Sequence, residues 1–315
     1  MTTIYLTLQN IQTEEVSVHA GFYTAGFPAM TAFAGFGHAF ELRFKAHLAK
    51  VVRDDPSRED SWDIPEEKET QFKVSGVIPV ITAYHMAAGP AKRVSYETET
   101  KSKAAPLAFA PLADMNLDIV FRVEASLSVS ELKHAMSHPA MTGLIQTMRL
   151  SGGSLFWNGT CEVAESLEVI LANASTTAYI LEDCTPTLKS YLETNAESTV
   201  VEALDRLTSR LYAKSANDSL TGYAPNAEEL PYEPRHVALA MGYRALEEKA
   251  TVRNCSKNGN PHLFVEPVVG LGRVRMLASV KAALKREENV DMVWAYQAPT
   301  EDGYFLIRGE SALTF

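Results

Sequence analysis

The feature that most constrains this chain is a glycine-punctuated loop that leads into a helix of small residues, within residues 21–48. The stretch reads GFYTAGFPAMTAFAGFGHAFELRFKAHL. Gly21 and Gly26 can adopt positive φ, and Pro28 suits a first helical turn because no N–H is needed there. Such a helix start exposes unpaired N–H groups and a partial positive charge, so a phosphate can lie against it. The same residues also suit a tightly packed helix–sheet contact, and both interpretations stay open.

Length and composition are those of an ordinary folded protein. The 315 residues, 46% of them hydrophobic, are enough for one large domain or two smaller ones with a sizeable core. The first residues, MTTIYLTLQNIQ, are typical of a strand and not of a signal peptide, and no run reaches the length of a membrane span. We therefore expect a cytoplasmic protein with no membrane partner.

Residues that carry chemistry do not form a recognisable constellation. No HExxH, GxSxG or P-loop motif is present, and the three isolated cysteines have neither CxxC nor Cys/His spacing. We therefore expect no enzyme activity, no metal and no cofactor. His38, on the helix of the opening stretch, is the most tempting general acid or base, although such a histidine more often packs or forms structural hydrogen bonds.

The net charge of −10 argues against indiscriminate binding of nucleic acid, which usually requires a strongly basic surface. The charge is unevenly spread, however, because acidic residues concentrate in residues 54–69 and 182–233. Basic residues fall in other stretches: Lys92, Arg93, Lys101, Lys103, Arg149, Arg253, Lys257, Arg273 and Arg275. An acidic protein with a local basic groove is therefore compatible with the sequence.

A projecting hairpin is expected near residues 86–115. Residues 73–86 are rich in β-branched and aromatic side chains and predict a long strand, with Pro79 marking an edge or a bulge. Gly89-Pro90 predicts a turn, and residues 92–100 alternate again as a returning strand. Lys92 and Arg93 open that strand, where they can grip a backbone or remain solvated.

The first part of the chain follows the order of a split βαβ fold. Its predicted elements are a strand at 4–8, the helix of the opening stretch, strands at 73–86 and 117–127, a helix at 128–148 and a strand at 163–171. This order is typical of ferredoxin-like and RNA-recognition folds, which hold nucleic acid on the sheet face or at its edge. We therefore predict an α+β protein with a ferredoxin-like core and a protruding hairpin.

The second part of the chain is expected to be helical before it returns to the core. Helices are predicted from about Pro186, at 198–212 and at about 235–249, with a linker at 217–234. A strand at 263–269, a glycine turn at 270–275, a helix and a final hairpin follow. The predicted division is a core at residues 1–184, a helical subdomain at 185–255 and a C-terminal segment at 256–315.

Three glycine-rich segments form the most coherent candidate site. They lie at 21–28, at 152–153 and at 270–272, each with an arginine or hydroxyl nearby. If they converge in space, their N–H groups and guanidiniums would cradle a sugar-phosphate backbone of defined shape.

These segments also resemble the marker segments of a known family. GFPAMTAFAGFGHAF follows the first strand, MRLSGGSLFW lies in the middle, and VVGLGRVR precedes the terminal helix and hairpin. In order and spacing they are similar to the Cas-five-class RAMP subunits of the type I-F CRISPR Cascade, or Csy, surveillance complex. The central segment ends in Phe156-Trp157 where the family has Pro-Trp, and the chain is acidic. Both departures suggest a divergent or minimal-variant member.

The resemblance implies a ribonucleoprotein subunit of antiviral defence that binds RNA without cleaving it. It would bind the 5′ handle of the crRNA, cap one end of the backbone and help to position target DNA near the protospacer-adjacent motif. Its partners would be crRNA, backbone RAMP subunits, a large subunit and target DNA. The residues assigned to RNA by position, with Phe22 added as a ring on which a base can stack, are Phe22, Gly26, Phe27, Pro28, Thr31, His38, Lys92, Arg93, Arg149, Gly152, Gly153, Ser154, Gly270, Gly272 and Arg273.

Three other functions remain open at this point. The chain would be the repeated backbone subunit that coats the crRNA if many copies assemble, and the cap if one does. It would be a metal-independent endoribonuclease if His38 acts as the general acid or base. It would be a protein-interaction module without RNA if the glycine segments only pack.

Overall fold

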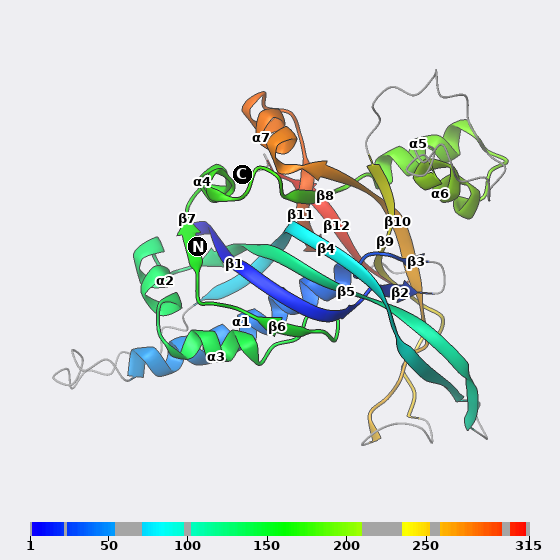
Figure 1. Cartoon of the computed structure of the whole chain (residues 1–315), viewed down its shortest axis with the longest axis horizontal. Helices are drawn as coiled ribbons and strands as arrows, with labels where there is room; N and C mark the ends of the chain where they lie inside the picture. The colour runs from blue at the N-terminus through cyan, green and yellow to red at the C-terminus, as the bar shows by residue number, and fades with distance from the viewer. Residues whose placement is uncertain are drawn as a thin grey trace.

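The computed structural model describes residues 2–21, 24–53, 71–97, 102–209, 235–252, 259–297 and 303–312. These residues form an α+β protein built on a large antiparallel sheet, which confirms the α+β part of the predicted fold (Figure 1). Its strands are β1 (Thr2–Ser17), β2 (His19–Gly21), β3 (Thr24–Ala25), β4 (Phe72–Glu97), β5 (Ser102–Ala125), β6 (Ser154–Phe156), β7 (Cys161–Ala164), β8 (Tyr179–Asp183), β9 (Arg235–Ala245), β10 (Val265–Met276), β11 (Asp291–Tyr296) and β12 (Tyr304–Ser311). Its helices are α1 (Met30–Arg53), α2 (Val129–Met136), α3 (Ala140–Gln146), α4 (Leu167–Asn173), α5 (Thr185–Thr194), α6 (Val200–Ser209) and α7 (Leu277–Lys285).

Helix α1 packs closely on the strands of the first half of the chain. Strand β1 pairs with β5 on one side and with β6 and β7 on the other, and β5 pairs with β4. The rings of Phe40 and Phe121 stack with centroids 4.7 Å apart. A Cβ at Gly37 would lie 2.8 Å from a methyl of Val77, so glycine is needed at this point for the helix to approach the sheet.

Both faces of the sheet are covered by helices. One core contains α1, α2 and α3 residues packed on β1 and β5, and the other contains α4 and α7 residues packed on the opposite faces of β4, β5 and β8. The predicted helix at 128–148 is divided into α2 and α3 where Pro139 interrupts it. The predicted strand at 163–171 is wrong beyond Ala164, because Ser166 accepts a hydrogen bond from the Glu168 N–H at 3.2 Å and begins α4.

The β4–β5 hairpin projects as expected, but its turn lies elsewhere. The two strands stay paired from Phe72 and Ala125 out to Glu97 and Ser102. The turn predicted at Gly89-Pro90 is wrong, because a register shift between Ala88 and Ala91 absorbs this dipeptide as a bulge. Strand β1 pairs with β5 only as far as Leu112, and beyond it the hairpin extends away from the sheet (Figure 1). The side chains of Lys92 and Arg93, on β4, fall outside the described residues.

The strands of the second half form a closed ring with β4. The sheet runs β11–β12–β9–β10–β8–β4, and β11 pairs again with β4 through Trp294 and Val77. The indole N–H of the fully buried Trp294 donates to the Leu181 carbonyl at 3.1 Å. This ring replaces part of the predicted helical subdomain, because residues 235–245 form β9 and not a helix. The helices predicted from about Pro186 and at 198–212 are present as α5 and, as far as the described residues extend, as α6.

The segment predicted as a late glycine turn, residues 270–275, is also part of a strand. Gly270 and Gly272 lie within β10, opposite Leu239 and Val237 of β9. A Cβ at Gly270 would collide with the Met241 sulfur, and a Cβ at Gly272 would collide with the Leu239 side chain. These glycines therefore provide room for packing across the sheet and do not form an exposed bend.

Within the described residues, no helix has the length and apolar character needed to cross a membrane.

Candidate nucleic-acid interface

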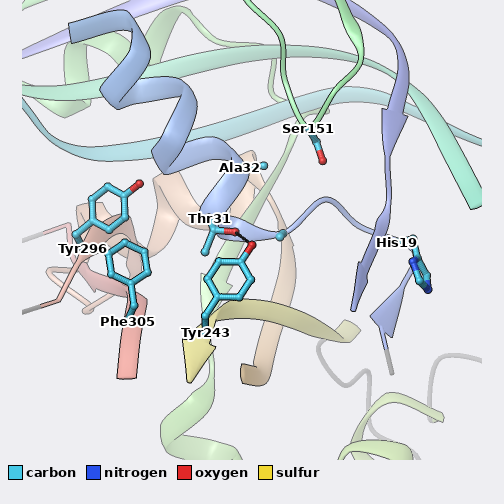
Figure 2. A pocket seen from close by; sticks show the side chains of 8 residues that line it. His19, Thr31, Ala32, Ser151, Tyr243, Tyr296 and Phe305 are labelled. Atoms are coloured by element: carbon cyan, nitrogen blue, oxygen red, sulfur yellow. Dashed lines mark hydrogen bonds between the residues drawn. The ribbon is translucent and has the colours of Figure 1, made fainter. Parts of the chain in front are cut away.

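A cavity of about 380 Å³ lies at the N-terminus of α1. Its walls come from six separate parts of the chain. The lining residues are His19, Ala29, Thr31, Ala32, Ser151, Tyr243, Tyr296 and Phe305 (Figure 2). The first turn of α1, the central glycine turn and the ends of β9, β11 and β12 therefore meet at one place. Its volume is in the range of small-molecule sites.

The loop that leads into α1 is held by an aromatic residue of β4. Gly26 has φ of 129° and its N–H donates to the Val18 carbonyl at 3.0 Å. The Tyr84 hydroxyl donates to the Gly26 carbonyl, and burial raises the pKa of this phenol. The ring of Phe27 stacks on Phe33 and Tyr84 with centroids 5.8 and 6.1 Å apart. Phe27 thus fixes the loop by internal packing, whereas Phe22 lies outside the described residues.

The central glycine turn lies directly on the end of β1. The backbone N–H of Ser17 donates to the Ser151 carbonyl at 3.1 Å, and the Ser151 hydroxyl donates to the Ser17 carbonyl at 2.9 Å. Gly152 has φ of 84°, and a Cβ at Gly153 would lie 2.6 Å from the Glu14 carbonyl oxygen. This sequence therefore forms a tight turn where one was predicted, and the turn brings Ser151 to the cavity.

The aromatic wall was missed by sequence reasoning. Tyr243 lies near the end of β9, Tyr296 ends β11 and Phe305 lies near the start of β12. The hydroxyls of Thr31 and Tyr243 are 3.4 Å apart, and the rings of Tyr296 and Phe305 have centroids 5.1 Å apart. The three rings remain 39 to 44% exposed, so they present faces to solvent. Burial raises the pKa of Tyr296.

Arg149 and Arg273 have different surroundings. Arg149 is exposed beside the central turn and donates to the Ser154 hydroxyl. Arg273 donates to Glu182 from Nε at 2.7 Å, and Arg275 donates to the same carboxylate at 3.3 Å. Because Glu182 is buried, the Arg273 guanidinium serves to join β8 to β10. The predicted convergence of three glycine segments is therefore wrong for the third. The cavity is lined by Ala29, Thr31 and Ala32, which follow the first segment, and by Ser151, which precedes the second.

The position of His38 separates it from the cavity. It is exposed on α1 and is not among the residues that line the cavity walls. Thr31 is the residue of the predicted helix that reaches the cavity, and Pro28 is buried behind it.

The cavity offers three kinds of contact to a ligand. The first turn of α1 provides backbone N–H groups and a partial positive charge, which suit a phosphate. Thr31, Ser151 and Tyr243 provide hydroxyls that both donate and accept hydrogen bonds. Tyr296 and Phe305 provide rings on which a planar group can stack. The described residues that line the cavity include no lysine or arginine.

The fold and this cavity define an α+β protein with a candidate interface for a nucleotide of a nucleic-acid strand. Residues 6–307 match the model of the CRISPR-associated protein family Cas_Csy2, and the chain belongs to that family. It is therefore a CRISPR Csy-type subunit, as the resemblance of its three marker segments implied. Comparison with curated proteins found no match.

Proposed function

We propose that the chain is the crRNA-binding subunit that caps the 5′-handle end of the backbone in a type I-F Csy complex. The observation that carries the proposal is that two marker segments, through Thr31 and Ser151, line one aromatic-walled cavity in a chain of the Csy2 family. The strand order β7–β1–β5–β4, with α1 and α2–α3 between the strands, supports the ferredoxin-like RAMP core expected of such a subunit.

The cavity suits one unstacked nucleotide of the handle. Its phosphate would lie at the first turn of α1, near Thr31 and Ser151, and its base would stack on Tyr296 or Phe305. Single-stranded RNA is commonly recognised in this way, because bases outside a duplex expose both a flat face and a hydrogen-bonding edge. Arg149, beside the same turn, would contact the neighbouring phosphate.

Other parts of the chain would then meet the remaining partners. The projecting β4–β5 hairpin, which carries Lys92 and Arg93, would act as a thumb on an adjacent backbone subunit. The helices α5 and α6 would contribute to the contact with target DNA near the protospacer-adjacent motif.

We further propose that the subunit is not catalytic. The aromatic cavity offers stacking and N–H contacts, and His38 lies outside its walls. Incubation of the purified chain with repeat RNA tests this part, and cleavage that disappears in His38→Ala would establish the endoribonuclease instead. The mass of the assembled complex distinguishes the cap, present once, from the repeated backbone subunit.

The binding proposal is tested by measuring the affinity of the purified full chain for labelled handle RNA by fluorescence anisotropy. Replacing Tyr296 and Phe305 together by alanine should weaken binding at least about fivefold, because loss of stacking of one base costs about 1–3 kcal/mol. The matched control is Val169→Ala, since Val169 is 50% exposed on α4. Equal affinity of the double variant and the wild type would contradict the proposed site, and no RNA binding by the wild type would contradict the function.

A further inference from the structure

The two ends of the cavity fix the order in which a nucleotide can lie in it. In the proposed site the phosphate lies at the first turn of α1, and the base stacks on Tyr296 or Phe305. Because the ribose joins the phosphate to the base covalently, it must lie between these two ends. The side chains found there therefore decide which sugar the cavity accepts.

Two hydroxyls occupy this intermediate position. Figure 2 shows Thr31, from the first turn of α1, and Tyr243, from β9, pointing toward each other, and their hydroxyl oxygens are 3.4 Å apart. Tyr243 pairs with Phe305 across β9 and β12, and residues paired in this way carry their side chains on the same face of a sheet. The Tyr243 hydroxyl thus lies between the start of the helix and a ring that can hold the base.

The hydroxyl pair has hydrogen-bonding capacity left for a ligand. Either oxygen can be the donor to the other, so one hydroxyl proton and several lone pairs remain. Their separation is also long, since about 2.7–2.8 Å is usual for an O–H···O hydrogen bond. The Ser151 hydroxyl differs, because it already donates its proton to the Ser17 carbonyl at 2.9 Å.

We propose that Tyr243 is a specificity-determining residue, whose hydroxyl binds, together with that of Thr31, the 2′-hydroxyl of one nucleotide and so selects ribose over deoxyribose. The pair donates one hydrogen bond to the 2′-oxygen and accepts one from it, and deoxyribose offers neither. Contacts to phosphate do not make this distinction, because RNA and DNA share the same phosphate. The inference rests on the proposed function, and it adds the means by which the chain distinguishes crRNA from a DNA strand.

The test combines a change in the protein with a change in the RNA. Fluorescence anisotropy measures binding of the full chain to labelled handle RNA and to a set of the same RNA in which each position in turn carries a 2′-deoxynucleotide. The variant is Tyr243→Phe, which keeps the ring and removes the hydroxyl. The matched control is Tyr179→Phe, since Tyr179 is a partly buried residue of β8 that does not line the cavity.

For the wild type, we expect a 2′-deoxynucleotide at one position to weaken binding about three- to tenfold, as loss of one or two neutral hydrogen bonds does. Tyr243→Phe should weaken binding of the unmodified RNA by a similar factor, and the deoxynucleotide at that position should then cost little more, because the two changes remove the same contact. Tyr179→Phe should behave as the wild type does. Thr31→Val removes the other hydroxyl of the pair and should abolish the effect of the same position.

The proposal is overturned if the wild type binds the RNA but no single 2′-deoxynucleotide weakens binding, and the proposed function would then still stand. It is also overturned if Tyr243→Phe and the deoxynucleotide weaken binding independently, because the hydroxyl would then contact the phosphate or the base. Different sensitive positions in Tyr243→Phe and Thr31→Val would refute a shared contact. Absence of RNA binding by the wild type would refute the proposed function and this inference together.

Discussion

The central turn contains two neighbouring glycines, Gly152 and Gly153. Replacing each by alanine measures a different cost: backbone strain at Gly152 and steric overlap at Gly153. At Gly153, a Cβ would lie 2.6 Å from the Glu14 carbonyl oxygen and 2.8 Å from the Val16 backbone nitrogen. Because these atoms belong to the backbone of β1, they cannot move aside as a flexible side chain does. Gly153→Ala should therefore lower the free energy of unfolding by about 2–3 kcal/mol, as overpacking of a rigid site does.

The neighbouring substitution Gly152→Ala tests backbone conformation alone. Gly152 has φ of 84°, and no atom lies within 4 Å of the position of its Cβ. Its cost should be only about 1–2 kcal/mol, which is the penalty of the left-handed region for a residue with a side chain. Gly35→Ala is the control, because Gly35 lies inside α1 with open space around its Cβ and alanine should stabilise the helix by about 0.5–1 kcal/mol.

Denaturant unfolding followed by the fluorescence of the buried residues Trp157 and Trp294 gives the three free energies by linear extrapolation. The expected order of stability is Gly35→Ala above the wild type, then Gly152→Ala, then Gly153→Ala. If Gly153→Ala is no less stable than Gly152→Ala, the turn does not lie against β1, and the position of Ser151 at the cavity would also be wrong.

Two further substitutions test other parts of the fold. Glu182→Gln should lower the free energy of unfolding by about 2 kcal/mol in denaturant titrations, because it leaves the guanidiniums of Arg273 and Arg275 without their charged partner. The control is Glu165→Gln at an exposed position, which should change the free energy of unfolding by less than about 0.5 kcal/mol. Burial raises the pKa of Tyr5 to about 12 from 10.0, with a smaller opposing effect from Arg122, so the unfolded phenol ionises first as pH rises. The wild type should then lose stability relative to Tyr5→Phe between pH 10 and pH 12, whereas a constant difference in melting temperature across that range would contradict the raised pKa.

The first half of the fold could be predicted because its signals are local. Pro28 and the small residues after it set the start of α1, and Gly152-Gly153 produced the turn that was expected. Residues 235–245 were mistaken for a helix because HVALAMGY is a continuous apolar run, which periodicity alone does not assign to a helix or a strand. Pairing of these residues with β10 on one side and β12 on the other makes them a strand.

The candidate site could be predicted only in part for a related reason. Closely spaced glycines predict a turn at Gly270 and Gly272 as they do at Gly152. In the structure, however, Gly270 and Gly272 face side chains of β9 instead of solvent. Arg273 was assigned to RNA because the sequence does not show that Glu182 lies opposite it. The aromatic wall required the ends of β9, β11 and β12 to meet the start of α1, and only the tertiary structure provides that contact.

The opening stretch was compatible with an accessible helix start and with a tightly packed helix–sheet contact. The structure shows each at a different point along α1. At Gly37 the residue is small because β4 lies against it, whereas around Gly26 and Gly35 there is open space. The accessible end of α1 therefore carries the cavity, and the following turns carry the packing. In the proposed function this division would let an acidic chain bind RNA, because the contacts would come from N–H groups, hydroxyls and rings instead of a basic groove.

A consequence is that RNA affinity should depend weakly on salt. Contact with one or two phosphates predicts a slope of log K against log salt of about −1, since each phosphate neutralised on a single strand contributes about −0.7. The net charge of −10 flattens the slope further, because salt screens the repulsion between the chain and RNA. Anisotropy titrations of the wild type at several salt concentrations measure this slope, and Arg149→Ala should reduce its magnitude by about 0.7. A slope steeper than about −4 would place the main contacts on lysines and arginines elsewhere, and the cavity would then not be where the RNA backbone is held.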